Sequence, residues 1–139
     1  MTDQPFRTPT EAEVLHASAD IVAAFEATDT ERYFAAFAPE TSFIFHPEPA
    51  RLDTRADYEA LWASWIEGGW RVVSCASSKP LVTTYPGGAV FSHVVDTTVF
   101  ADGAEESYTE QETIVFRVEG DGLIAVHEHL SAYTGEASA

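Results

Sequence analysis

The first part of the chain carries apolar residues at helical spacing. Thr10 and Glu13 match a capping box, in which two side chains satisfy backbone N–H groups at a helix start. The apolar positions that follow recur every three or four residues: Val14, Ala17, Ile21, Val22 and Phe25. This spacing predicts a helix that ends near Thr28. Asp29 is a suitable cap for a second, short helix, which Pro39 would end.

A short strand and a third helix follow. Residues 41–47, TSFIFHP, are rich in Phe and Ile and predict a strand ending at His46-Pro47. Thr54 then opens a helix that Gly68-Gly69 ends. Its apolar stripe is aromatic and consists of Tyr58, Leu61, Trp62 and Trp65. Such a stripe is typical of a helix face that packs on a core.

From Trp70 onward the pattern is that of β-strands separated by turns. Runs rich in β-branched and aromatic residues span 70–77, 81–85, 89–100, 106–118 and 123–133. Between them stand Ser-Lys-Pro, Pro-Gly-Gly, Ala-Asp-Gly-Ala and Glu-Gly-Asp-Gly, which are turn sequences. The order of helices, strand, helix and hairpins predicts an α+β fold, with three helices packed on one face of a mostly antiparallel sheet.

Composition narrows the number of domains and the partners. The 139 residues suffice for one domain with one core, at 10–133, between a flexible arm at 1–9 and a flexible tail at 134–139. The chain has 23 acidic and 7 basic residues, which give a formal net charge of −16. This charge repels phosphate backbones and anionic membrane surfaces. We therefore expect neither nucleic acid nor a membrane as partner. The single cysteine, Cys75, and the lack of a secretory leader pattern predict a cytoplasmic protein.

Hairpin counting predicts which polar side chains meet. If Asp102-Gly103 forms a two-residue turn, His93 lies opposite Glu112 and Phe91 lies opposite Ile114. This prediction depends on loop length, because a change of one residue reverses the face of every side chain beyond it.

The last hairpin extends the same face. Pairing of Val118 with Leu123 would place His127 opposite Ile114 and His129 opposite Glu112. The resulting face holds Phe91, His93, Glu112, Ile114, His127 and His129. The opposite face would carry the apolar strip Ile124, Val126 and Leu130.

Three imidazoles around one carboxylate allow three kinds of chemistry. They titrate as a group and suit general acid/base catalysis. They also suit a polar core whose hydrogen bonds are all made. Three His and one Glu are, finally, ligands that Zn²⁺ accepts. The sequence leaves these alternatives open and implies no cofactor.

Several segments together resemble a known superfamily. Residues 23–40, 42–47, 57–65 and 126–131 are similar in order and character to the nuclear transport factor 2-like superfamily, which includes ketosteroid isomerases and SnoaL-type polyketide cyclases. The resemblance implies a curved sheet wrapped around three helices into a cone. It also implies a pocket at one end of the cone and a homodimer formed through the outer sheet face.

The resemblance also places the isomerase site on this chain. The general base, an Asp before Pro in the isomerases, corresponds to His46, and the helix-one tyrosine falls near Ile21, which cannot donate a hydrogen bond. The protonated carboxylic acid falls on Ile114, with Glu112 two residues earlier. Steroid isomerisation itself is therefore not expected.

These observations predict a small-molecule-binding protein, with an isomerase-, cyclase- or hydrolase-like acid/base enzyme as one form of it. The residues expected to be catalytic are His46, Glu112, His93 and His129. Those expected to contact an organic ligand are Phe25, Tyr33, Phe37, Trp62, Trp65, Phe91, Ile114 and His127. The alternatives are a non-enzymatic interaction or dimerisation domain and a metal-binding His/Glu site.

Overall fold

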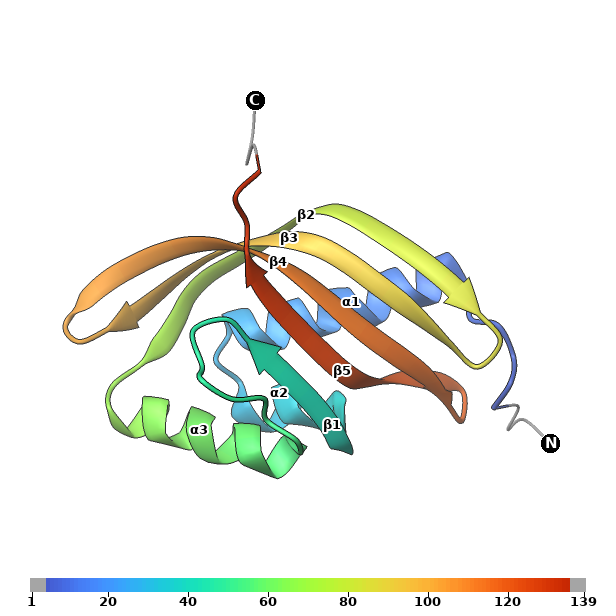
Figure 1. Cartoon of the computed structure of the whole chain (residues 1–139), viewed down its shortest axis with the longest axis horizontal. Helices are drawn as coiled ribbons and strands as arrows, with labels where there is room; N and C mark the ends of the chain where they lie inside the picture. The colour runs from blue at the N-terminus through green and yellow to red at the C-terminus, as the bar shows by residue number, and fades with distance from the viewer. Residues whose placement is uncertain (1–4, 136–139) are drawn as a thin grey trace.

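A curved five-stranded sheet arches over three helices (Figure 1). The computed structural model describes residues 5–135, so the ends of the predicted arm and tail, 1–4 and 136–139, lie outside the described residues. The elements are α1 (Glu11–Glu26), α2 (Thr30–Ala35), β1 (Phe37–Phe45), α3 (Arg55–Glu67), β2 (Arg71–Tyr85), β3 (Gly88–Ala101), β4 (Ala104–Glu119) and β5 (Gly122–Ala132). The predicted α+β class is confirmed. None of the helices in 5–135 is long and apolar enough to cross a membrane.

The helices begin where their caps predict. The Thr10 side chain accepts a hydrogen bond from the Glu13 N–H and the Glu13 side chain accepts one from Thr10, so the capping box is confirmed. Asp29 and Thr54 cap α2 and α3 with their side chains alone, which accept from the Arg32 and Asp57 N–H groups. The second helix ends earlier than predicted, at Ala35, and Pro39 lies inside β1. Proline is tolerated there because β1 is an edge strand.

Two of the predicted strands are one. The runs 70–77 and 81–85 form the continuous strand β2, so the predicted Ser-Lys-Pro turn is wrong. The segment is instead an irregularity between Ser78 and Leu81, with Lys79 at a φ of 53°. Because β2 is the other edge strand, Pro80 removes no hydrogen bond from an inner strand.

The sheet order is β1-β5-β4-β3-β2, and only the β1/β5 pair is parallel. Asp102 and Gly103, at φ 53° and 81°, form the two-residue turn of the β3/β4 hairpin, since both positions of such a turn need positive φ. The predicted pairings of His93 with Glu112 and of Phe91 with Ile114 are confirmed.

The last hairpin departs from the prediction through a β-bulge. Val118 pairs with Leu123 as expected, but the register shifts after Phe116 and Ala125, and Val126 is the extra residue. Beyond the bulge, each side chain of β5 therefore points to the side of the sheet opposite to the predicted one. The residues that turn inward are Glu128 and Leu130, and those that turn outward are His127 and His129.

Contacts with the start of β1 hold the backbone at this bulge. The Ala125 N–H donates to the Ala36 carbonyl at 3.0 Å, and the Ala125 carbonyl accepts from the Thr41 hydroxyl at 2.9 Å. Thr41 is fully buried, and its single hydroxyl proton is shared between this carbonyl and that of Ala38, 2.6 Å away. The bulge is thus fixed by long-range contacts, which no local turn sequence in VHEH announces.

The core between sheet and helices is aromatic. Trp62 is 1% exposed and stacks on Tyr33 with ring centroids 4.9 Å apart. Tyr58 packs edge-on against Phe34 and Phe43 at 5.0 and 4.6 Å. Such offset and edge contacts add to the stabilisation from burial. The prediction that the α3 stripe faces the core is confirmed for its buried members Tyr58 and Trp62, and Trp65 packs against the same cluster.

Candidate functional site

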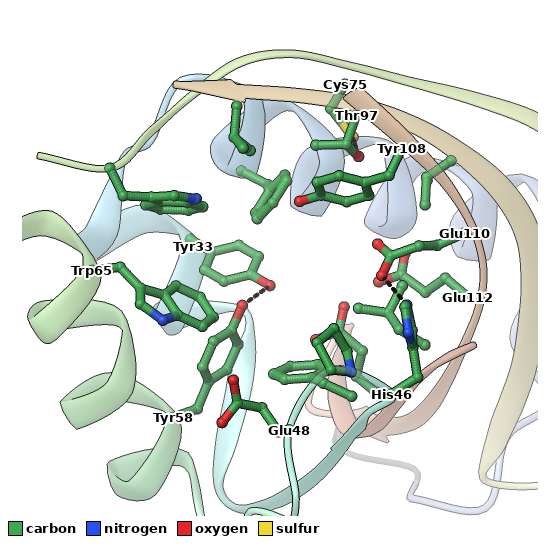
Figure 2. Close-up of a pocket in the computed structure, with 18 of the residues that line it drawn as sticks. Tyr33, His46, Glu48, Tyr58, Trp65, Cys75, Thr97, Tyr108, Glu110 and Glu112 are labelled. Atoms are coloured by element: carbon green, nitrogen blue, oxygen red, sulfur yellow. Dashed lines mark hydrogen bonds and ion pairs between the residues drawn. The ribbon is translucent and has the colours of Figure 1, made fainter. Parts of the chain in front are cut away.

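A cavity of about 470 Å³ opens between the inner face of the sheet and the helices. This volume lies in the range of small-molecule sites. Most of the lining is apolar, and its aromatic members are Phe25, Tyr33, Phe45, Tyr58, Trp65, Trp70 and Tyr108. Figure 2 shows Tyr33, Tyr58 and Trp65 on one side of the open space and His46, Glu110 and Glu112 on the other.

One polar pair stands on the sheet side of the cavity. His46 directly follows β1, and its Nε2 lies 2.6 Å from Oε2 of Glu110 on β4. The His46 side chain is 40% exposed and that of Glu110 only 10%, so the imidazole is accessible while its carboxylate partner is covered. Burial raises the pKa of Glu110, against the opposing effect of the His46 hydrogen bond. The pair has the composition of a proton-transfer dyad.

A second pair lies deeper. Nε2 of the fully buried His93 donates to Oε1 of Glu112 at 2.6 Å, and the Ser77 hydroxyl lies 2.6 Å from His93 Nδ1. We assign the proton to Nε2 because an ionised carboxylate only accepts. Burial alone raises the pKa of Glu112, but hydrogen bonds from Glu128 and His93 outweigh it and the pKa is lowered. Glu112 is therefore the ionised member of this group.

Glu128 is the opposite case. It is 2% exposed, and burial, the charge of Glu112 and a hydrogen bond to Glu112 raise its pKa well above the usual range. The two side chains form a carboxylic acid and carboxylate pair, in which Glu128 holds the proton that Glu112 accepts. Its Oε1 atom has no hydrogen-bond partner among the described residues, although Glu128 lines the cavity.

Two buried phenols continue this network. The hydroxyls of Tyr33 and Tyr58 lie 3.0 Å apart, and Tyr33 lowers the pKa of Glu128, an effect smaller than the burial that raises it. Burial, followed by the charge that Glu128 carries once it ionises at higher pH, raises the pKa of both tyrosines, so both remain phenols. Either hydroxyl can donate to the other, and the one that accepts keeps its own proton for a further partner.

A third phenol enters from β4. The Tyr108 hydroxyl points into the cavity (Figure 2), two residues before Glu110 on the same strand face. Burial, with the charge of Glu110, raises its pKa. Beside it, the Thr97 hydroxyl donates to Cys75 Sγ at 3.7 Å. Burial raises the pKa of the Cys75 thiol to about 11, so Cys75 is not a nucleophile at neutral pH.

The structure brings some of the predicted site residues to the cavity and leaves others behind its wall. Those that line the cavity are His46, Glu112, Phe25, Tyr33 and Trp65. Those buried in the core without lining it are Phe37, Trp62, Phe91 and Ile114. His93 is also buried and reaches the cavity only through its hydrogen bond to Glu112. The roles predicted for these residues remain proposals.

The predicted placement of His127 and His129 is wrong, because the bulge turns both to the outer face. His127 Nδ1 lies 2.9 Å from the Ser42 hydroxyl on β1, and its ring centroid is 6.2 Å from that of His129. Partial burial lowers the pKa of His127, and the charge of the neighbouring His129 lowers it further. The set of ligands suggested for Zn²⁺ is thereby split between two faces, and residues 5–135 contain no group of three or more His, Cys, Asp or Glu placed to hold a metal ion.

Sequence reasoning missed several cavity residues. Glu110 and Tyr108 share the face of Glu112 by strand alternation, so that signal was present. Tyr58 was assigned to the core alone, although its ring also borders the cavity. Glu128 had no local signal, because only the bulge turns it inward.

The fold and the cavity define a cone-shaped α+β domain with an acidic, aromatic interior. The model of the SnoaL-like domain family matches residues 14–135. The chain belongs to this family, within the nuclear transport factor 2-like superfamily. The superfamily resemblance inferred from the sequence is confirmed.

Solved structures show the same fold at low identity. An NTF2-like superfamily protein from Salmonella enterica serovar Typhimurium has a TM-score of 0.76 and 18% identity, over 92% of this chain and 95% of that one. An NTF2-like protein from Cytophaga hutchinsonii has a TM-score of 0.76 and 14% identity, over 90% and 100%. The CamKII hub homology domain of Chlamydomonas reinhardtii has a TM-score of 0.71 and 22% identity, over 88% and 98%. No curated protein matches the sequence.

Proposed function

We propose that the protein binds a small, largely apolar organic molecule in the cavity and catalyses an acid/base reaction on it. The main support for this proposal is the His46–Glu110 pair, whose Nε2 and Oε2 atoms lie 2.6 Å apart on the wall of a cavity of about 470 Å³. An accessible imidazole held by a covered carboxylate suits the removal and return of a proton. Membership of the SnoaL-like family supports a ligand-binding role of isomerase-like type.

The neighbouring phenol supplies the second function that such a reaction needs. Removal of a proton next to a carbonyl, or loss of an oxygen leaving group, places negative charge on an oxygen. The Tyr108 phenol faces the cavity and can donate a hydrogen bond to that oxygen. In this proposal neutral His46 is the base, Glu110 positions it and stabilises the imidazolium that forms when the proton is taken, and Tyr108 is the donor. The reaction is an isomerisation, cyclisation, dehydration or hydrolysis.

A generic carbon acid tests the base without knowledge of the natural substrate. In 5-nitrobenzisoxazole, loss of the ring C–H proton to a base breaks the N–O bond and gives a coloured cyanophenolate. We expect the protein to accelerate this elimination over buffer, and His46→Gln to lower the rate by roughly 100-fold or more. His16→Gln, at an imidazole 81% exposed on α1, is the matched control and should keep the wild-type rate.

Three outcomes of that assay decide the proposal. A wild-type rate equal to that of buffer would contradict a usable base in the cavity. An unchanged rate in His46→Gln would place the base elsewhere. Loss of rate in Glu110→Gln, with the free energy of unfolding retained, would support the dyad, because the substitution leaves the imidazole in place and removes its charged partner.

The proposal includes a homodimer formed through the outer sheet face, in the cytoplasm. All three helices lie on the other side of the sheet (Figure 1), and one solved neighbour is described as a hub homology domain. With Leu130 turned inward, the predicted strip is broken, and the apolar residues of the outer face include Ile124 and the paired Val90 and Val115. Sedimentation should show a dimer that Val115→Glu separates into folded monomers. A monomeric wild-type protein would contradict it.

A further inference from the structure

The cavity wall offers several acceptor oxygens to a ligand. The hydroxyls of Tyr33 and Tyr58 share one hydrogen bond at 3.0 Å in which either can donate, and Thr97 gives its proton to Cys75. Whichever phenol donates, each hydroxyl oxygen keeps a lone pair for a ligand donor. Glu128 Oε1, on a side chain 2% exposed, has no partner among the described residues. A buried acceptor left unpaired costs stability, so a ligand that donates to it gains affinity.

The charge of the lining has one sign apart from His46. The carboxyl groups that line the cavity are Glu48, Glu106, Glu110, Glu112 and Glu128. Among residues 5–135, no Lys or Arg lines it. An anionic ligand would be repelled both here and by a protein of net charge −16, whereas a cation would be attracted by both.

The apolar wall next to these oxygens is built of aromatic rings set at differing angles. Trp65 and Trp70 have ring centroids 5.2 Å apart at 51°, and Tyr58 stands at 71° to Trp65 with a 6.2 Å separation. All three rings line the cavity. Aromatic faces grouped in this way attract organic cations, and the Trp ring attracts them most strongly.

We propose that the ligand of this cavity is an organic ammonium compound, with its N–H donors on Glu128 Oε1 and Tyr58 Oη and its hydrocarbon part against Trp65 and Trp70. The inference rests on the proposed function and adds the class of substrate to it. The ammonium end lies on the Glu128 side and leaves the His46–Glu110 side free for the reacting group. Binding of the cation favours the ionised form of Glu128, so a proton is released on binding and affinity rises with pH.

Three probes of nearly equal shape and different charge test this inference. They are 2-phenylethylammonium, 2-phenylethanol and phenylacetate, each titrated into the full chain by calorimetry at pH 7.5 and moderate salt. We expect the ammonium to bind at least 10-fold more tightly than the alcohol, and phenylacetate to bind more weakly than both. Chemical shifts of the Trp65 and Trp70 indole N–H groups locate the bound probe.

Variants assign the preference to Glu128 and to the rings. Glu128→Gln should reduce ammonium affinity at least 10-fold and leave the alcohol within about two-fold, which removes the preference. Glu11→Gln removes an exposed charge at the far end of α1 and should leave it intact. If Glu128→Gln does not fold, Trp65→Leu gives a second test, since it should weaken the ammonium at least three-fold more than the alcohol.

The outcomes separate this inference from the proposed function. Equal affinities for ammonium and alcohol would overturn the inference while small-molecule binding stands. Tightest binding of phenylacetate, or a preference for ammonium that survives Glu128→Gln, would also overturn it. Failure of all three probes to bind at 10 mM, a concentration at which even a Kd on the order of 1 mM gives saturation, would contradict both.

Discussion

Replacement of Glu128 by Gln should stabilise the protein increasingly as the pH rises. Burial, the nearby Glu112 charge and the hydrogen bond to Glu112 raise the pKa of Glu128 well above 4.5 in the folded state. Below that ordinary value both the folded and the unfolded chain hold the proton. Above it the unfolded chain releases the proton while the folded chain keeps it. The free energy of unfolding therefore falls as pH rises through this window, until pH passes the folded pKa.

The magnitude follows from one bound proton. A difference of one proton between the two states corresponds to about 1.4 kcal/mol for each pH unit. Gln cannot ionise, and its amide N–H can still donate to Glu112 in place of the carboxylic acid. The stability of Glu128→Gln relative to wild type should thus rise by about 1.4 kcal/mol per unit above pH 5, up to the folded pKa of Glu128. Near pH 4 the two proteins should differ by less than about 1 kcal/mol.

Urea unfolding at pH 4, 5, 6 and 7 measures this difference, because contributions shared by the two proteins cancel. Glu11→Gln, at an exposed carboxylate, is the control and should stay within about 0.5 kcal/mol of wild type at each pH. A difference between Glu128→Gln and wild type that is flat, or that favours wild type more as pH rises, would refute the assignment of the proton to Glu128.

Three further predictions concern other parts of the network and the fold. Tyr33→Phe and Tyr58→Phe should each lower the free energy of unfolding, measured in urea, by about 1–2 kcal/mol. The double variant should lose less than the sum, because it leaves no phenol of the pair without its partner. Additive losses would contradict the 3.0 Å hydrogen bond. Thr10→Ala should cost about 1 kcal/mol through loss of the α1 cap, and an unchanged midpoint would contradict the cap. Cys75, with a pKa of about 11, should react with a thiol reagent at pH 8 slowly when folded and rapidly in urea, and fast reaction of the folded protein would contradict its burial.

The sequence was sufficient where local chemistry decides the structure. The cap residues Thr10, Asp29 and Thr54 start the helices as predicted, since each side chain bonds a backbone N–H three residues on. Asp102-Gly103 sets the register of the β3/β4 hairpin, since few residues accept positive φ at both turn positions. From that turn alone, the pairing of His93 with Glu112 could be counted.

The sequence was insufficient where a distant segment decides. The bulge at Val126 is held by Ala36 and Thr41, far away in the chain, and the alternation in VHEH predicts an unbroken strand. Because of this one extra residue, Glu128 and Leu130 face the inside of the sheet in place of His127 and His129. The predicted His-rich cluster thereby became a cluster of carboxylates and phenols, and both the metal alternative and the expected chemistry changed with it.

The carboxylates on the inner face argue for function because the fold does not need them. Glu110, Glu112 and Glu128 are all nearly buried, and ionisable groups placed so close together raise the energy of the folded state. Apolar residues at these positions would fill the cone, as Ile114 and Phe116 do further along the same face of β4. Departures from a consistent core are expected at functional sites. These three acids, together with the three phenols and the imidazole around the open cavity, are the groups that the proposed ligand-binding site uses.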